Sequence, residues 1–485
     1  MAPDILGVGG ATAVAEEPGH RIGAAGFQRS TENVALRHAD QYYVHNVAVG
    51  MRRVATASFV GTAIEYYDFF IYGTAAALVF PEVFFPDLSP TVATVASLST
   101  FAVAFLSRPV GAAVFGHFGD RLGRKRTLVA TLMIMGLSTV GVGLVPGADS
   151  IGVAAPLLLM VLRLLQGFAV GGEWAGSALL SAEYAPPQKR GRYGMFTQLG
   201  VGAGLLLGNL VFLIANVTVG ETSPTFMSWG WRVPFLFSAV LLIIALYIRV
   251  SIEETPVFRE VVHEPGQAPL SELFNAQPRQ VVLGSGCMIG VFTFSFMGGT
   301  YLMGYATTIL AHPREVVLTV GVLGGVAMLV STALAAVLCD RVGRRRVILT
   351  GFCLAVPWSF VVMPLIDTDS TLLFGVAIMV TYGILGIASG PMAAFLPEIF
   401  ATRYRYSGAG LAFNLGGIVG GAVPPILAGP LVDAFGPLSI GVMMASLVTV
   451  SLATTYLLPE TKGVELAAVG VPPQALRGSA IDSRR

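Results

Sequence analysis

Twelve apolar stretches of this chain are each long enough to cross a lipid bilayer as an α-helix. A helix needs about 20 residues to span the roughly 30 Å of hydrocarbon in a bilayer. Because 54% of the 485 residues are hydrophobic and 12% are charged, the composition excludes a soluble globular protein. The stretches cover residues 54–80, 92–116, 127–146, 153–180, 193–217, 232–250, 280–309, 316–338, 347–366, 371–396, 407–433 and 437–458. The sequence therefore predicts an all-α membrane protein with twelve transmembrane helices.

Polar segments flank and divide these stretches. Residues 1–51 are rich in glycine and alanine and contain no apolar signal-peptide core, so we expect a disordered tail. Residues 459–485 have the composition of a second tail. The polar linker 252–279 separates the spans six and six, which predicts an N-terminal bundle over 52–251 and a C-terminal bundle over 280–458.

A basic octapeptide occurs twice, 220 residues apart, and each copy follows a predicted span. It reads Gly-Asp-Arg-Leu-Gly-Arg-Lys-Arg at 119–126 and Cys-Asp-Arg-Val-Gly-Arg-Arg-Arg at 339–346. This recurrence indicates that the two six-helix bundles are pseudo-symmetric repeats. Parallel repeats related by an axis along the membrane normal are typical of transporters that expose a central site alternately to the two sides of the membrane.

Charges in the connecting loops predict the orientation of the chain. Cations follow the second, fourth, eighth and tenth spans, whereas acidic residues predominate in the loops on the other side. Cytoplasmic loops carry an excess of lysine and arginine. We therefore expect both termini and the 252–279 linker to lie in the cytoplasm. We predict a multi-pass protein of the cell inner membrane.

Ionisable residues inside the predicted spans are concentrated in the N-terminal bundle. Placing one in hydrocarbon costs at least about 2.5–3.5 kcal/mol, so such residues usually have a function. The N-terminal spans contain Glu65, Asp68, Arg108, Arg163 and Glu173, whereas the C-terminal spans contain almost none. This asymmetry predicts that the coupling chemistry lies in the first bundle and that the second contributes shape and neutral polar contacts.

Glu65 and Asp68 are three residues apart and therefore share one helix face, which Tyr72 continues. Two carboxylates so close, near the middle of the membrane, cannot both ionise without a large electrostatic cost. We expect one of them to hold a proton, as a proton-coupling site requires. The alternative is that one of them pairs with Arg108 or Arg163, and the choice between the two carboxylates stays open.

Arg163 is the predicted anchor of an anionic substrate, because its planar guanidinium fits a carboxylate. The alternative is a structural counter-ion for a carboxylate of the first span. Gln166, one turn further on, is expected to add a polar contact, and Glu173 is equally a third proton-coupling candidate, a gate residue or an interhelical partner. Arg108 is best explained by a structural ion pair. Further substrate-binding candidates, each also explained by packing, are Tyr72, Tyr301, Tyr305, Tyr382 and Asn414.

Several motifs resemble those of the major facilitator superfamily and, within it, the metabolite:proton symporters. The superfamily motifs are Gly-His-Phe-Gly-Asp-Arg-Leu-Gly-Arg-Lys-Arg at 116–126 and Arg-Leu-Leu-Gln-Gly at 163–167. Motifs more specific to the symporter group are Ile-Glu-Tyr-Tyr-Asp-Phe-Phe-Ile-Tyr-Gly at 64–73, Gly-Gly-Glu-Trp at 171–174, Trp-Gly-Trp-Arg-Val-Pro at 229–234 and Glu-Thr-Pro-Val-Phe at 254–258. The resemblance covers roughly residues 52–460 and extends to shikimate and related organic-acid transporters.

The resemblance implies the major facilitator fold and a proton-driven importer of a small polar metabolite, with Glu65, Asp68 and Arg163 at the functional positions. Members of the group carry organic acids such as shikimate, α-ketoglutarate and citrate, or zwitterions such as proline and betaine. Because Arg163 suits a carboxylate, we predict symport of a proton with a small organic acid such as shikimate. Uptake of a zwitterionic osmolyte and then drug–proton antiport are the alternatives.

Other classes of membrane protein find no support in the sequence. No Gly-x-x-x-x-Gly-Lys-Ser/Thr loop for phosphate binding occurs, so ATP-driven transport is unsupported. No group of His, Cys and carboxylate residues has the spacing of a metal site, and we expect no cofactor, no metal and no enzyme activity. The expected partners are a small organic acid, protons and the lipid bilayer. The net charge of +1 does not favour nucleic acid, and nothing requires more than a monomer.

The two octapeptides lie at the predicted cytoplasmic surface, at least half a bilayer from Glu65, Asp68 and Arg163, so we expect them to form a gate. Asp120 is expected to pair with neighbouring arginines or to cap a helix N-terminus across the seam between the bundles. The resemblance implies that this loop stabilises the outward-open state. The second copy is expected to be a weaker counterpart, because Cys339 replaces a glycine. The predicted gating residues are Gly116, Asp120, Arg121, Gly123, Arg124, Asp340, Arg341 and Arg344.

Overall fold

The computed structural model describes residues 54–122, 124–220, 223–251 and 270–464. The predicted tail at 1–51, the linker residues 252–269 and the tail residues 465–485 lie outside this description. The described residues form helices joined by turns and short loops, without a β-strand. We call residues 54–251 the first half and residues 270–464 the second half.

Helices long and apolar enough to cross a membrane make up most of the described chain. Two of the predicted spans correspond to the helix over 54–78 and to α4 (Arg124–Leu144), whose apolar part is Val129–Leu144. The remaining ten among the described residues are Pro90–Phe115, Ala154–Leu179, Arg190–Val219, Gly230–Ile248, Pro278–Thr308, Arg314–Val342, Arg344–Ile366, Thr371–Glu398, Arg405–Phe435 and Leu438–Leu457. The predicted all-α fold with twelve spans is confirmed.

The first half begins with the helix over 54–78. It continues with α2 (Phe80–Phe84), α3 (Pro90–Leu122), α4, α5 (Ala148–Ile151), α6 (Ala154–Val170), α7 (Glu173–Tyr184), η1 (Pro187–Lys189), α8 (Arg190–Val219), α9 (Pro224–Ser228), η2 (Gly230–Arg232) and α10 (Val233–Ser251).

The second half begins inside the predicted linker, with the short helix α12. It consists of α12 (Leu270–Ala276), α13 (Pro278–Phe296), η3 (Met297–Tyr301), α14 (Leu302–Thr308), α15 (Arg314–Val342), α16 (Arg344–Ile366), α17 (Thr371–Ser389), α18 (Met392–Glu398), η4 (Thr402–Tyr404), α19 (Arg405–Gly417), η5 (Ile418–Ala422), α20 (Val423–Phe435) and α21 (Leu438–Leu457). Residues 459–464, which the sequence placed in the second tail, also belong to the described part of this half.

The fourth and tenth spans are broken where the sequence weakens a helix. Gly171 and Gly172 separate α6 from α7, and Gly390 and Pro391 separate α17 from α18. Glycine disfavours a helix interior, and proline lacks the backbone N–H that would continue the helix. The breaks leave backbone carbonyl groups available to other partners.

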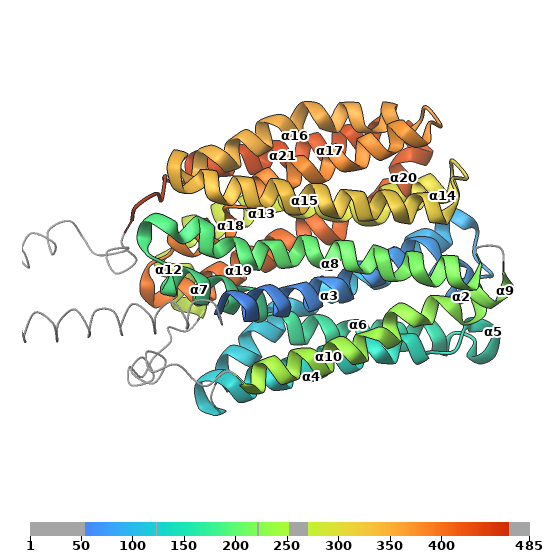
Figure 1. Ribbon diagram of the computed structural model, residues 1–485, viewed down its shortest axis with the longest axis horizontal. Coiled ribbons are helices and arrows are strands. Elements are labelled where there is room, and N and C mark those ends of the chain that lie inside the picture. The colour runs from blue at the N-terminus through green and yellow to red at the C-terminus, as the bar shows by residue number, and fades with distance from the viewer. Residues whose placement is uncertain (1–53, 123, 221–222, 252–269, 465–485) are drawn as a thin grey trace, which may run out of the picture. The chain divides into compact units, whose positions relative to one another are not determined.

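The ends of the bundle differ in charge. The end near α7, α12 and α18 in Figure 1 carries Lys189, Arg190, Arg341 and Arg344–Arg346, and we call it the basic end. The end near α2, α5, α9 and α14 carries acidic residues, and we call it the acidic end. These acidic residues include Glu82, Asp149, Asp367 and Asp433.

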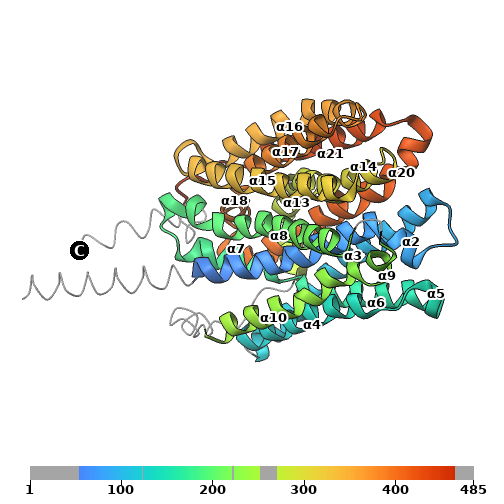
Figure 2. The same cartoon turned by 45° about the vertical axis from the view of Figure 1, so that its right-hand side comes forward.

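Glycines set the closest contacts between helices. A Cβ atom at Gly167 would overlap the carbonyl oxygen of Ala104 on α3, and one at Gly171 would overlap that of Arg108. This spacing of four residues lets α6 approach α3 backbone to backbone. Across the seam between the halves, α8 lies beside α15 in both views (Figures 1 and 2), and a Cβ at Gly325 would lie 2.9 Å from the Cα of Leu206.

Candidate functional site

The charged residues predicted inside the first half are all buried. Their exposed fractions range from 0% at Arg163 to 5% at Glu173, with Glu65, Asp68 and Arg108 at 1% each. In the second half, buried charges lie at helix ends, as at Arg344, Glu398 and Arg405. The charges that face the middle of the described bundle therefore come from the first half.

A chain of hydrogen bonds connects Arg163 to Asp68. The guanidinium of Arg163 donates to Oε1 of Gln166, and Nε2 of Gln166 donates to Oγ1 of Thr139 over 2.7 Å. Thr139 donates to Oδ2 of Asp68 over 2.8 Å, and Ser238 donates to Oδ1 of Asp68, also over 2.8 Å. We call these five residues the polar chain. It links the first, third, fourth and sixth spans of the first half.

Aromatic rings surround the guanidinium of Arg163. Its Cζ lies 4.0 Å from the ring centre of Tyr72 and 5.2 Å from that of Phe101. The hydroxyl of Tyr72 shares a hydrogen bond of 2.7 Å with Thr100. Cation–π contacts of this kind hold a desolvated cation without neutralising its charge. Arg163 therefore remains a positive group inside the first half.

Arg108 lies in the same aromatic environment. Its Cζ is 4.2 Å from the ring centre of Phe69 and 4.3 Å from that of Phe105. Phe69 also lies 5.0 Å from Cζ of Arg163, so the two guanidinium groups share one ring. Arg108 lies close enough to Glu65 for the two charges to influence each other, and its structural ion pair remains a prediction.

Aromatic side chains from both halves contact one another beside these arginines. Phe105 lies 6.2 Å from Phe292 and 5.2 Å from Phe296, and Phe101 lies 5.2 Å from Phe296, between ring centres. We call Phe69, Phe101, Phe105, Phe292 and Phe296 the aromatic layer. It fills the seam between the halves beside the two arginines.

The second half approaches this layer through π-helical turns. A Cβ at Gly421 in η5 would lie 3.1 Å from the ring of Phe105, and one at Gly299 in η3 would lie 3.2 Å from Phe70. Tyr382 lies under η3 and donates to the carbonyl of Ser295 over 3.3 Å. Turns of this type occur often at functional sites, because they interrupt the regular hydrogen bonding of a helix.

At the basic end, side-chain amides close the seam. Asn414 of α19 donates to the carbonyl of Gly171 over 2.8 Å, and Gln198 of α8 donates to the carbonyl of Ser389, also over 2.8 Å. Each amide thus bonds to the helix break of the opposite half. Tyr406 donates to Gly172 over 2.9 Å in the same way.

Ion pairs lie beyond these amides, nearer the basic surface. Glu398 pairs with Arg190 of the first half at 3.5 Å and with Arg344 at 3.4 Å, and Arg344 pairs with Asp340 at 3.2 Å. We call these four residues the ion cluster. Asp340 also accepts the backbone N–H groups of Gly191 and Arg192, both over 2.9 Å, and so caps the N-terminus of α8 from the opposite half.

The start of the predicted second tail completes the ion cluster. Thr461 donates to Glu398 over 2.5 Å, and Glu460 accepts the backbone N–H of Arg344 over 2.8 Å. Arg341, predicted as a gating residue, has an exposed side chain, while its carbonyl accepts a hydrogen bond from Lys462. Side chains of the first octapeptide lie outside the description, so the predictions for Gly116, Asp120, Arg121, Gly123 and Arg124 remain predictions.

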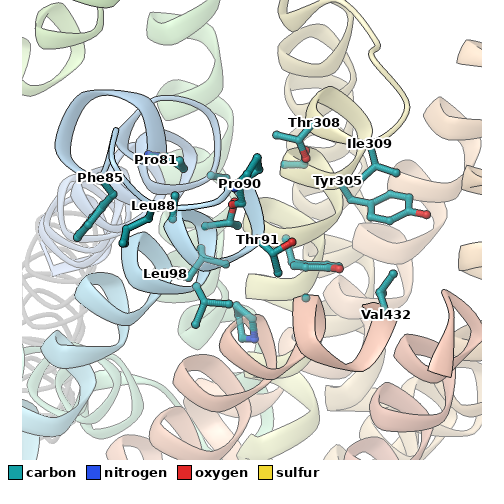
Figure 3. Close-up of a pocket in the computed structure, with 18 of the residues that line it drawn as sticks. Pro81, Phe85, Leu88, Pro90, Thr91, Leu98, Tyr305, Thr308, Ile309 and Val432 are labelled. Carbon is teal, nitrogen blue, oxygen red and sulfur yellow. The ribbon is translucent and has the colours of Figure 1, made fainter. Parts of the chain in front are cut away.

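A cavity of about 500 Å³ opens between the halves at the acidic end (Figure 3). It is lined by Tyr301 and Tyr305, both predicted to bind substrate, and by the carboxylates of Glu82 and Asp433. Tyr305 donates to Asp367 over 2.8 Å. The described residues that line this cavity include no cation.

The predicted site residues thus fall into separate groups. Asp68, Arg163, Gln166 and Tyr72 lie together around the polar chain, with Arg108 beside Arg163 at the Phe69 ring. Tyr301 and Tyr305 line the cavity, Tyr382 lies beside η3, and Asn414 lies at the basic end. Sequence reasoning missed Thr139, Ser238, Gln198, Arg190 and Glu398 as site residues. The sequence signal that could have identified them is a polar side chain inside or at the end of an apolar stretch.

Comparison with known proteins identifies the family. A family profile described as Major Facilitator Superfamily matches residues 58–425. The chain belongs to the major facilitator superfamily. Its fold agrees: a crystal structure of a D-xylose–proton symporter superimposes with a TM-score of 0.68 at 20% identity, covering 85% of this chain and 99% of that one.

Several transport proteins are also similar in sequence. The inner membrane metabolite transport protein YhjE of Escherichia coli is 43% identical over 88% of this chain and 98% of its own length. The shikimate transporter of Escherichia coli is 39% identical over 79% and 88%, and the proline/betaine transporter of the same organism is 36% identical over 78% and 77%. These relatives are transporters of small metabolites, as the resemblance implied.

Proposed function

We propose that this chain imports a small organic acid together with a proton by alternating access. The observation that carries the proposal is the polar chain, which connects a buried cation to a buried carboxylate through Gln166 and Thr139. Buried ionisable groups in a membrane usually mark a transport pathway. We assign the carboxylate of the substrate to Arg163 and the proton to Asp68.

Thr139 provides a route for coupling. Its hydroxyl lies within donating distance of Asp68 and, over 3.0 Å, of the carbonyl of Met135. A hydroxyl has one proton to donate, so the two bonds compete. Protonation of Asp68 weakens its demand for a donor and favours the bond to Met135. The lone pairs of the Thr139 oxygen, which accept from Gln166, then point in a different direction, and the change reaches Arg163.

The contrast between the two ends supports alternating access. The basic end is held by the amides and the ion cluster, whereas the acidic end has a cavity and a partly exposed ion pair of 3.9 Å between Glu82 and Arg314. Because basic loops remain on the cytoplasmic side, we assign the acidic end to the outside. The two six-helix bundles would then rock around the aromatic layer, and the ion cluster would act as the cytoplasmic gate.

The proposal is tested with purified protein in proteoliposomes. We expect a pH gradient, acidic outside, to drive accumulation of at least one labelled acid from a panel of shikimate, protocatechuate and α-ketoglutarate, with betaine as the zwitterionic comparison. Uptake of every compound at a rate indifferent to the gradient would rule out proton symport.

Uptake of a zwitterionic osmolyte is the second candidate. The cavity favours it, because tyrosine rings and carboxylates without a lining cation suit a positively charged group. Membrane potential separates the two candidates. A monocarboxylate with one proton carries no net charge, whereas a zwitterion with one proton carries +1, so only the second uptake should accelerate at an inside-negative potential imposed with potassium and valinomycin.

A further inference from the structure

Arg108 has buried donors that the fold leaves unused. Its side chain is 1% exposed, and its Nε and Nη1 atoms have no hydrogen-bond partner among the residues that the structure describes. Its contacts with Phe69 and Phe105 use the ring faces, which do not replace a hydrogen-bond acceptor. A buried guanidinium with unused donors is unfavourable unless an acceptor arrives from elsewhere.

The surroundings of Arg108 indicate where such an acceptor would come from. Phe105, which covers Arg108, also contacts Phe292 and Phe296 of the second half and fits against Gly417 and Gly421. One ring therefore separates Arg108 from the seam that opens in alternating access. Phe101 stands between Arg163 and the same seam through Phe296.

We propose that Arg108 is a second anion-binding residue, and that the substrate carboxylate binds between Arg108 and Arg163 when Phe69 moves aside. The proposal rests on the proposed import of an organic acid. Both guanidinium carbons lie within 5.0 Å of the Phe69 ring centre, so an anion at that place would contact both cations. Two like charges that share a desolvated site also repel each other, and an anion between them relieves this repulsion.

Binding to the purified full-length protein tests the proposal independently of transport. The probes are shikimate and its uncharged methyl ester, measured by intrinsic fluorescence or calorimetry. Because a hydrogen bond to a charged group is worth about 10- to 100-fold in affinity, Arg108→Gln should raise the Kd of shikimate by about that factor. The Kd of the ester should change by less than about twofold. Arg108→Lys should lie between the wild type and Arg108→Gln.

A double variant separates binding from a structural role. If Arg108→Gln fails to fold because it leaves Glu65 without its counter-charge, Glu65→Gln/Arg108→Gln removes both charges and should fold. We expect this variant to keep the weakened binding of shikimate. Shikimate affinity equal to that of the wild type would reduce Arg108 to a structural partner of Glu65 and overturn the inference.

Arg232→Gln provides the matched control. Arg232 donates to the carbonyls of Gly143 and Val145, away from the aromatic layer, so its loss should leave the ratio of the two Kd values unchanged. The failures are distinguishable. In one outcome, the wild-type protein accumulates shikimate with a pH gradient and the double variant binds shikimate with wild-type affinity. That outcome supports the proposed function and rejects only the role of Arg108. If the wild-type protein binds shikimate no more tightly than its methyl ester, both the proposed function and the role of Arg108 are rejected.

Discussion

Asp68 accepts hydrogen bonds from two hydroxyl groups that differ in their other contacts. Variants of the two therefore distinguish a residue that only orients the carboxylate from one that also couples it to Arg163. Thr139 belongs to the route toward Arg163, whereas Ser238 bonds to Asp68 from α10 outside that route. Removing either hydroxyl leaves the carboxylate with one of the two donors. Only removal of the Thr139 hydroxyl also breaks the link between Asp68 and Gln166.

Asp68→Asn is expected to abolish accumulation driven by a pH gradient while leaving exchange of labelled for unlabelled substrate. Asparagine keeps the size of the side chain and takes up no proton in this range. Thr139→Val should lower the ratio of accumulation to exchange by about tenfold, the value of a hydrogen bond to a charged group. Both rates are measured in the same proteoliposomes.

Ser238→Ala is the control for Thr139→Val and should lower that ratio less, because the link from Gln166 to Asp68 remains. An equal or larger loss with Ser238→Ala would show that Thr139 acts only as a donor to the carboxylate. The assignment of a coupling route would then be wrong.

The buried charges could be found from the sequence because an ionisable residue is conspicuous in an apolar stretch. Thr139 and Ser238 could not, since a hydroxyl side chain is common in membrane helices and its partner depends on helix rotation. The same limit applies to the hydrogen bond from Asn414, a predicted substrate-binding residue, to the carbonyl of Gly171 in the other half.

At the scale of elements, glycine contacts hold α6 against α3 and thereby fix the distance between Arg108 and Arg163. The sequence does not identify which helix each glycine contacts. It also placed one continuous span over 153–180, whereas the helix breaks at Gly171 and Gly172. The break supplies the acceptor that Asn414 uses, so it is part of the seam.

Gly167→Ala is expected to destabilise the protein by about 1–3 kcal/mol, the usual effect of overpacking. The added methyl group would overlap backbone atoms of Ala104 on α3, which cannot move independently of the helix. Thermal unfolding in detergent measures the effect. Gly383→Ala is the matched control, because nothing lies within 4 Å of its added Cβ, and it should not lower the melting temperature. Equal melting temperatures for the two variants would contradict the close α3–α6 contact.

At the scale of the whole molecule, the two halves are joined by buried polar bonds at the basic end and separated by a cavity at the acidic end. Cys339 reports on this arrangement, because its buried sulfur packs against Gly191 at the seam. Cys287 is equally buried, but it contacts Met392 and Thr455 within the second half. The two thiols therefore distinguish opening of the seam from general loosening.

Glu398→Gln is expected to increase the alkylation rate of Cys339 by a membrane-permeant maleimide. Removing one member of a buried ion pair costs about 3–5 kcal/mol, so the closed state of the basic end should lose population. Asn414→Leu should have the same direction with a smaller effect, because a neutral hydrogen bond is lost. The rate at Cys287 should not change. Unchanged alkylation of Cys339 in Glu398→Gln would contradict the role of the ion cluster as a gate.

Proton movement with substrate is the most direct test of the account. Proteoliposomes containing a pH-sensitive dye are prepared with equal pH on both sides, and the transported organic acid is added outside. We predict that wild-type protein acidifies the lumen as the acid enters, with one proton for each monocarboxylate, and that Asp68→Asn gives no acidification. Entry of the acid into wild-type vesicles without a change in luminal pH would contradict proton-coupled symport.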